Sequence, residues 1–153
     1  VAAGLLHDYC RDLTGDELLA EARRLSLPLS EAHLERPVLL HGPVAAALCG
    51  EQFGLSEAVR EAIAWHTTGR PGLGPMGQGL ILADFAEPGR KYPEAATARE
   101  ILRRDGFRAA LLYVARQKVA FSRNKAYTDP NTAAFLFWLE KKEAETHGGT
   151  GPL

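Results

Sequence analysis

Three histidines and two aspartates stand at points where an apolar stretch of this sequence ends in a polar residue. The adjacent pair His7–Asp8 lies in GLLHDYCRD, His41 follows VLL, His66 follows AIAW and Asp84 follows LILA. A single histidine in such a place is more often a hydrogen-bonded core residue than a ligand, because a buried imidazole needs a polar partner. Four such places in one small domain favour a partner that they share, and a metal ion would serve all of them.

The types of these side chains narrow the choice of metal. Imidazole and carboxylate ligands without a thiolate suit iron, manganese, zinc or another first-row ion. Neighbouring residues on a helix point in different directions, yet an imidazole and the shorter carboxylate beside it can converge on an ion between them. Asp8 has two carboxylate oxygens and could bridge two ions. We therefore predict that His7 and Asp8 form a metal clamp.

The elements that must position these residues are predicted to be helices almost throughout. Apolar residues recur at helical spacing, and no run of alternating β-branched residues predicts a strand. Two capping boxes are expected, Thr14 with Glu17 and Thr97 with Glu100. The predicted helices cover residues 1–9, 16–25, 42–53, 57–66, 76–86, 99–105, 107–124 and 131–145. A loop with at most a short helical turn is expected at 26–37, and a loop rich in glycine and proline at 67–75. The predicted fold class is therefore all-α.

Length and composition limit the number of domains, the class of partner and the cellular location that the sequence allows. The 153 residues suit one domain, predicted at residues 1–145, with a polar, glycine-rich and disordered tail at 146–153. A net charge of −1 argues against a general nucleic-acid binder. No apolar run is long enough for a bilayer and no secretion signal is recognisable, so we expect a cytoplasmic protein without membrane contact. Cys10 and Cys49 are expected to be buried, reduced thiols and not a disulfide.

The sequence motifs around the predicted ligands resemble those of a known family. GLLHDYCRD, LLHGPVAA, AWHTTGRPG and ADFAEPGRKYP, in this order, are similar to the YqeK family of bacterial metal-dependent phosphohydrolases in the HD superfamily. The resemblance runs from residue 1 to about residue 140. It implies an HD-domain helical bundle, and hydrolysis of diadenosine tetraphosphate at its central bridge to give two molecules of ADP.

The resemblance also implies roles for the predicted ligands. His7, Asp8 and Asp84 would hold one ion together with a further histidine, on an upstream helix that this sequence does not contain. Asp8, His41 and His66 would hold a second ion, and a hydroxide bridging the two ions would be the nucleophile. The implied cofactors are two divalent transition-metal ions, iron in the first place, with manganese or another divalent metal as alternatives.

The implied ligand is a dinucleoside polyphosphate or a nucleotide, and further residues are predicted to bind it. The planar guanidinium of arginine matches phosphate oxygens, while threonine hydroxyls and backbone N–H groups add donors. The predicted substrate-binding residues are Arg11, Thr67, Thr68, Gly69, Arg70 and Arg90. Asp8 and Arg11 are the predicted catalytic residues.

The sequence departs from the usual family pattern at two further places. Arg11 stands where most members have lysine, which keeps the charge but changes its geometry. Gly77–Gln78 stands where a Glu–Lys pair is usual, which removes a cation.

Two alternatives to an enzyme stay open at this stage. One is a non-catalytic HD module that binds a nucleotide as a sensor or partner domain. The other is a helical interaction domain without metal, which leaves four buried polar positions without a common reason. Metal analysis separates this last alternative from the others, and a phosphate-release assay separates enzyme from sensor. The sequence also leaves the oligomeric state open, with a homodimer as one option.

Overall fold

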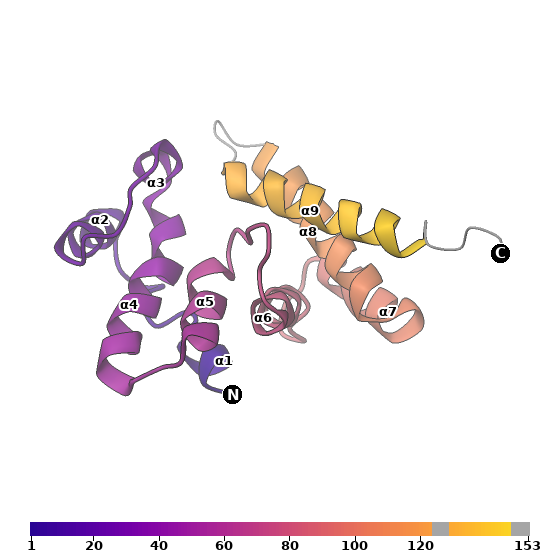
Figure 1. Cartoon of the computed structure of the whole chain (residues 1–153), viewed down its shortest axis with the longest axis horizontal. Coiled ribbons are helices and arrows are strands. Elements are labelled where there is room, and N and C mark those ends of the chain that lie inside the picture. The colour runs from indigo at the N-terminus through magenta and orange to yellow at the C-terminus, as the bar shows by residue number, and fades with distance from the viewer. Residues whose placement is uncertain (124–128, 148–153) are drawn as a thin grey trace.

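A computed structural model describes residues 1–123 and 129–147 of the chain. Within these ranges it contains helices and no strand, so the predicted all-α class is confirmed (Figure 1). In chain order the elements are α1 (Ala2–Leu6), α2 (Gly15–Arg24), α3 (Glu31–Glu35), the 3₁₀ helix η1 (Pro37–Leu40), α4 (His41–Phe53), α5 (Glu57–Trp65), α6 (Pro75–Phe85), α7 (Pro93–Asp105), α8 (Phe107–Arg123) and α9 (Pro130–His147). Residues 148–153 of the predicted tail lie outside the described residues, whereas Thr146 and His147 belong to α9.

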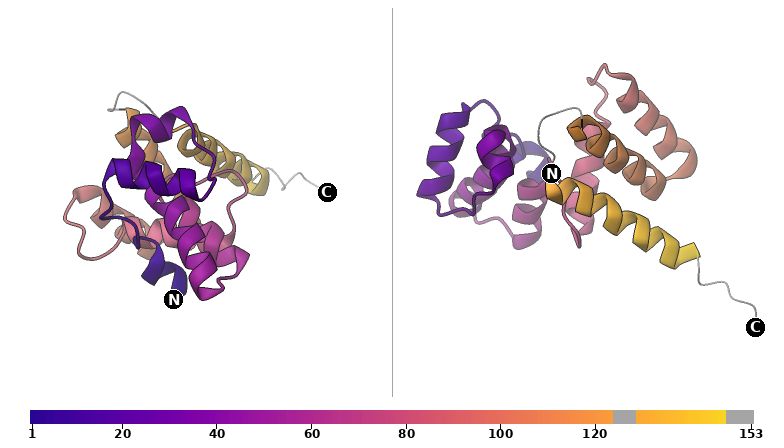
Figure 2. Two further views of the ribbon diagram at one scale, coloured as in Figure 1. Left: turned by 90° about the vertical axis from the view of Figure 1, so that its left-hand side faces the viewer. Right: turned by 90° about the horizontal axis from the view of Figure 1, so that it is seen from above.

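The helices form two groups, and each group has an apolar core (Figures 1 and 2). Helices α1, α2, α4 and α5, together with η1, enclose the first core, whose buried residues include Leu18, Leu40, Val44 and Ile63. Helices α6 to α9 enclose the second core, whose buried residues include Ile81, Leu111, Val114 and Phe135. Helix α6 packs against α5 and contributes Leu80 to the first core, so the two groups share a boundary. The predicted metal ligands come from elements along this boundary.

Two predicted helix ends are confirmed by their local hydrogen bonds. The Thr14 hydroxyl accepts from the Glu17 backbone N–H at 3.3 Å, and the Glu17 carboxylate accepts from the Thr14 N–H at 2.7 Å, which completes the capping box of α2. Helix α4 ends at Gly54, whose φ of +61° lies in the left-handed region that glycine adopts without strain. These local signals place α2 and α4 correctly, and α4 begins with His41.

Other predicted boundaries are wrong, and proline explains the largest difference. The Thr97 capping box does not form, because α7 already begins at Pro93, a residue well suited to the first helical position. The Thr97 hydroxyl instead donates to the Pro93 carbonyl at 3.1 Å. The first predicted helix ends at Leu6, and the chain then forms turns in which the Arg11 N–H donates to the Asp8 carbonyl at 2.9 Å. The loop expected at 26–37 does contain a short helical turn, the five-residue α3, and it ends at the start of η1.

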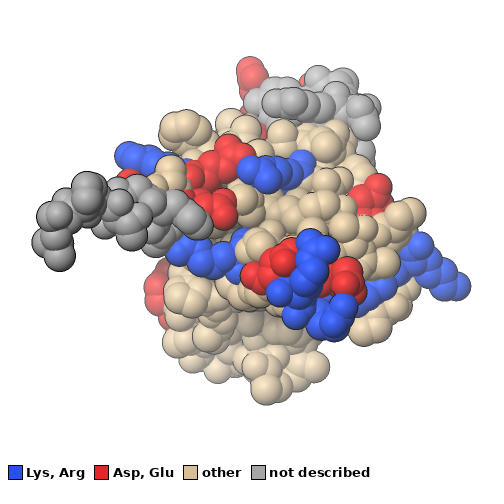
Figure 3. Space-filling view, turned by 90° about the vertical axis from the view of Figure 1, so that its right-hand side faces the viewer, with Lys and Arg blue, Asp and Glu red and all other residues tan. Residues whose placement is uncertain are grey.

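The surface and the cysteines agree with an ordinary globular domain. Acidic and basic side chains are interspersed over the face formed by the C-terminal helices (Figure 3). Among the described residues, none of the helices combines the length and apolar character that crossing a bilayer requires. Cys10 and Cys49 are buried and unbonded to each other, as predicted, and burial raises the pKa of the Cys10 thiol to about 11.

Candidate metal centre

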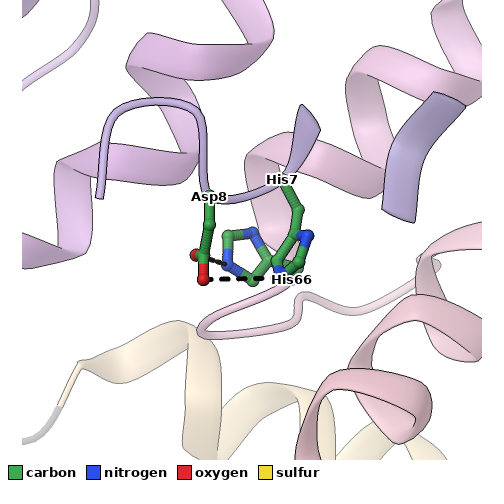
Figure 4. A group of neighbouring side chains, drawn as sticks. All are labelled: His7, Asp8 and His66. Atoms are coloured by element: carbon green, nitrogen blue, oxygen red, sulfur yellow. Dashed lines mark ion pairs between the residues drawn. The ribbon is translucent and has the colours of Figure 1, made fainter. Parts of the chain in front are cut away.

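The ends of three helical elements bring the predicted histidines together. His7 is the C-cap of α1, His41 is the first residue of α4, and His66 is the C-cap of α5. Because α1 packs on α5, the His7 ring meets the His66 ring edge-on, with centroids 4.9 Å apart (Figure 4). The His41 ring meets His66 from the α4 side, with centroids 4.8 Å apart. His41 and His66 are almost fully buried.

Asp8 faces all three rings, with Oδ1 toward His41 and His66 and Oδ2 toward His7. Its Oδ1 lies 3.3 Å from His41 Nε2 and 3.6 Å from His66 Nε2. Its Oδ2 lies 3.5 Å from His7 Nε2 (Figure 4). One ligand atom from each of His7, Asp8 and His66 lies within 4.8 Å of the other two. The adjacent His7–Asp8 pair therefore converges on a small volume, although the two residues are neighbours in the chain.

Backbone carbonyls determine which nitrogen of each histidine faces this volume. Each Nδ1 contacts the carbonyl three residues earlier: His7 with Gly4 at 2.9 Å, His41 with Val38 at 2.5 Å and His66 with Ile63 at 2.7 Å. A carbonyl can only accept, so Nδ1 donates its N–H, and in a neutral ring Nε2 then carries a free lone pair. This is the ring orientation that metal-binding histidines usually adopt.

The two buried histidines give a direct test of whether a metal fits here. Burial lowers the pKa of His41, and it lowers that of His66 to about 4, so both rings are neutral near pH 7. Their Nε2 atoms nevertheless face each other at 3.0 Å, and because each Nδ1 donates to a carbonyl, neither neutral ring has an Nε2 proton to share. Two lone pairs at this distance repel each other unless a cation binds both. The donor atoms therefore fit a divalent metal better than they fit each other.

Asp84 reaches the same region from the last turn of α6. Its Oδ1 lies 3.7 Å from His7 Nε2 and 2.6 Å from Nη2 of Arg90. Burial disfavours the charged carboxylate, but the hydrogen bond and the charge of Arg90 outweigh this effect and lower the pKa of Asp84. Asp84 is therefore an anion at neutral pH, held next to the histidine cluster.

Comparison with known proteins now identifies the family. A sequence model described as the HD domain matches residues 1–105. The chain therefore belongs to the HD domain family. The crystal structure of a "predicted HD superfamily hydrolase involved in NAD metabolism" from Clostridium acetobutylicum is similar, with a TM-score of 0.83 and 28% identity, over 92% of this chain and 75% of that chain.

Two curated relatives of this HD domain carry the same name, "Bis(5'-nucleosyl)-tetraphosphatase, symmetrical". The protein from Bacillus subtilis (strain 168) is 29% identical over 140 residues, which are 90% of this chain and 74% of that protein. The protein from Staphylococcus aureus (strain NCTC 8325 / PS 47) is 32% identical over 130 residues, which are 82% of this chain and 66% of that protein. The predicted membership of the HD superfamily is confirmed.

The predicted phosphate-binding residues of this HD domain fall into two places. Near the histidine cluster, the Thr67 hydroxyl lies 3.2 Å from His66 Nε2 and 3.4 Å from His41 Nε2. Arg90 is also there, paired with Asp84. Arg11 is near as well: burial is the main cause that lowers the pKa of His41, and the charge of the Arg11 guanidinium lowers it further. For Arg11, Thr67 and Arg90, contact with phosphate stays a prediction that the geometry allows.

Arg70 and Thr68 line a separate cavity of about 390 Å³, although Thr68 also lines a smaller cavity together with Thr67. The larger cavity is lined by residues of one face of α5, including Glu61 and Ala64, and Arg70 forms an ion pair with Glu61 there. His66 follows Ala64 by two residues, roughly 200° around the helix axis. The cavity and the histidine cluster therefore lie on opposite faces of α5. A role for Arg70 and Thr68 in binding phosphate stays a prediction.

Gly69 is required by the shape of the loop that follows α5. Its φ is +71°, and a Cβ at this position would lie 2.5 Å from Cδ1 of Phe135. Its N–H donates to the Trp65 carbonyl at 2.8 Å. The N–H that was predicted to face phosphate is thus already bonded within the turn.

Lys118 of α8 was missed by the sequence analysis. Its Nζ donates to the Thr67 carbonyl at 2.9 Å and lies 3.5 Å from the His66 carbonyl. A signal was available, because Lys118 lies at helical spacing from the buried Leu111 and Val114. A lysine on an apolar helix face needs a polar partner, and the end of α5 provides it.

Proposed function

We propose that this HD domain is a metal-dependent hydrolase that cleaves diadenosine tetraphosphate symmetrically into two molecules of ADP. One observation carries the proposal: the His41 and His66 Nε2 atoms face each other at 3.0 Å beside the Asp8 carboxylate, while the Nδ1 atom of each ring is bonded to a backbone carbonyl. The substrate and the site of cleavage come from the curated relatives, which are named as symmetrical tetraphosphatases. The buried free thiols of Cys10 and Cys49 support a cytoplasmic location.

The side chains divide between two proposed ions according to the contacts of Asp8. Asp8, His41 and His66 would hold one ion, since Oδ1 of Asp8 faces the two buried rings. Asp8, His7 and Asp84 would hold the other, since Oδ2 of Asp8 lies 3.5 Å and Oδ1 of Asp84 lies 3.7 Å from His7 Nε2. Divalent ions in such a site supply Lewis-acid activation of water and neutralise charge on a phosphate. We propose iron, with manganese or another divalent metal as alternatives.

The protein's own groups have separate tasks in this proposal. The apolar ends of α1, η1 and α5 exclude water from His41 and His66, which keeps both rings neutral and able to bind metal. Arg11 and Arg90 stand at the exposed side of the centre, where their guanidinium groups would bind phosphates next to the one being cleaved. Contacts with phosphates next to the reacting group would favour an internal phosphate over a terminal one.

Arg90 gives a prediction that separates substrate binding from metal binding. Arg90→Ala is expected to lower kcat/KM for diadenosine tetraphosphate about 10- to 100-fold, because a charge-assisted contact contributes about 1.5–3 kcal/mol. Manganese binding should be unchanged or tighter, since Asp84 loses the cation that binds it at 2.6 Å. Arg103→Ala, which removes a surface pair with Glu100, is the matched control. Parallel losses of metal and activity would show that Arg90 serves only to hold Asp84.

Product analysis tests the function itself. The purified chain is loaded with Fe²⁺ without oxygen, or with Mn²⁺, and incubated with diadenosine tetraphosphate before chromatography. ADP as the sole nucleotide product is expected. AMP and ATP in equal amounts would refute symmetrical cleavage. Binding of the dinucleotide without turnover, under any added divalent metal, would support the non-catalytic sensor instead.

A further inference from the structure

Lys118 connects the second helix group to the candidate metal centre. It belongs to α8, whose apolar face packs in the second core, yet its ammonium group reaches the end of α5 in the first group. Nζ lies 2.9 Å from the Thr67 carbonyl and 3.5 Å from the His66 carbonyl. The residue is partly buried, and it lines a cavity of about 120 Å³ together with Thr67. Its hydrogen bonds therefore act on the segment that carries a predicted ligand.

The segment held by Lys118 controls two groups of the centre. His66 is the C-cap of α5, and its ring orientation depends on the contact of Nδ1 with the Ile63 carbonyl at 2.7 Å. The next residue, Thr67, places its hydroxyl 3.2 Å from His66 Nε2. Carbonyls at the end of a helix have no partner within the helix, and they carry its partial negative charge. An ammonium group donating to them stabilises this turn in one conformation.

The charge of Lys118 alone would act in the opposite direction. Asp84 and Lys118 attract each other, so the ammonium group lies within electrostatic range of the proposed ligands. A cation so placed repels a divalent ion and weakens its binding. If charge were the whole effect, removing Lys118 would tighten metal binding. If its hydrogen bonds hold the His66–Thr67 turn in place, removing it weakens metal binding.

We propose that Lys118 is a positioning residue of the metal centre, which holds the His66–Thr67 turn so that the His66 ring and the Thr67 hydroxyl face the metal. This inference rests on the proposed metal site. It gives α8 a role in that site, although α8 supplies none of the predicted ligands. A metal-binding measurement therefore tests it without any assumption about the substrate.

The experiment compares Mn²⁺ binding by calorimetry in the wild-type chain and in Lys118→Met, Lys118→Gln and Lys118→Arg. The two neutral variants remove the charge and the reach of the ammonium group. They are expected to bind Mn²⁺ roughly 10- to 100-fold more weakly, as is typical when a partner of a metal ligand is lost. Lys118→Arg keeps donors and is expected to recover most of the affinity. Lys141→Met, at an exposed position of α9, is the matched control and should bind as the wild type does.

The outcomes distinguish this inference from the proposed function. Circular dichroism first establishes which variants are folded, and either folded neutral variant is sufficient for the test. Mn²⁺ binding equal to or tighter than that of the wild type, in either neutral variant, overturns the positioning role. Unchanged metal affinity with a raised KM would overturn it as well, and would make Lys118 a direct substrate contact. Failure of the wild-type chain to bind any divalent metal would instead refute the proposed function.

Discussion

Asp8→Asn is expected to remove most of the bound metal and to lower kcat/KM by more than about 100-fold. Loss of a group that merely orients a metal ligand costs about 10- to 100-fold, and loss of a ligand should exceed this. Asp8 faces both sides of the centre, with Oδ1 3.3 Å from His41 Nε2 and Oδ2 3.5 Å from His7 Nε2. Asparagine has nearly the same shape, but a neutral amide does not bridge two cations.

The metal-free protein should respond to the same substitution in the opposite sense. In the wild type, the Asp8 carboxylate lies next to the Nε2 lone pairs of His41 and His66. Without a metal, the carboxylate and these lone pairs repel each other. The asparagine amide can donate to one of these Nε2 atoms, so metal-free Asp8→Asn should unfold at the same temperature as the wild type or higher. Metal at 100 times its Kd would stabilise the wild type by about 2.7 kcal/mol. Asp8→Asn should lose this increase in melting temperature.

Asp12→Asn is the matched control, because Asp12 is an exposed aspartate four residues further along the chain. It should keep the metal content, the activity and the metal-dependent rise in melting temperature of the wild type. Full metal content in Asp8→Asn, measured by elemental analysis, would contradict a bridging role for Asp8.

Much of the candidate centre could be predicted because its geometry is local. A polar residue at the end of an apolar helix lies next to the core, because its apolar neighbours are buried. It therefore needs a hydrogen-bond partner or an ion there. In His7, His41 and His66, the Nδ1 atom finds one partner three residues earlier in the same segment. The free Nε2 then faces outward from the helix end in all three cases. The sequence pattern of apolar residues followed by histidine thus predicts the orientation of the imidazole ring as well as its position.

The contributions that arise from packing between distant segments could not be predicted in this way. Lys118 meets the His66 carbonyl across 52 residues of sequence, and its partner depends on how α8 packs against the first group. Arg70 is the reverse case, since it lies only four positions after His66 in the sequence but pairs with Glu61 on the other face of α5. Nearness in sequence predicts a shared site only where the helix face is also shared.

Competing start signals explain why helix boundaries were harder to predict than helix identities. Thr97 and Glu100 have the spacing of a capping box, but Pro93 precedes them and begins α7 one turn earlier. Once Pro93 occupies the first position, Thr97 lies inside the helix and its hydroxyl bonds to the Pro93 carbonyl. The same sequence is compatible with a helix that starts at Pro93 and with one capped by Thr97. Pro93 comes first in the chain and determines where α7 begins.

Gly42→Ala is expected to destabilise the protein at the point where α4 crosses α5. A Cβ on Gly42 would lie 2.8 Å from the Ile63 carbonyl oxygen and 3.0 Å from that of Ala64. These obstacles are backbone atoms of α5, so they cannot move aside as a flexible side chain would. Alanine is otherwise favoured over glycine within a helix by about 1 kcal/mol. We expect the clash to outweigh this and to lower the free energy of unfolding by about 1–3 kcal/mol.

The same substitution should weaken metal binding, and a second glycine provides the comparison. The new Cβ would also lie 3.2 Å from His66 Nδ1, and the Ile63 carbonyl that it meets is the one that orients this ring. Gly79→Ala in α6 has no atom within 4 Å of the added carbon, so it should raise the free energy of unfolding by about 0.5–1 kcal/mol. Urea unfolding and Mn²⁺ titration of both variants measure these effects. If Gly42→Ala were as stable as Gly79→Ala and kept its metal affinity, the close contact of α4 with α5 would not be what aligns His41 with His66.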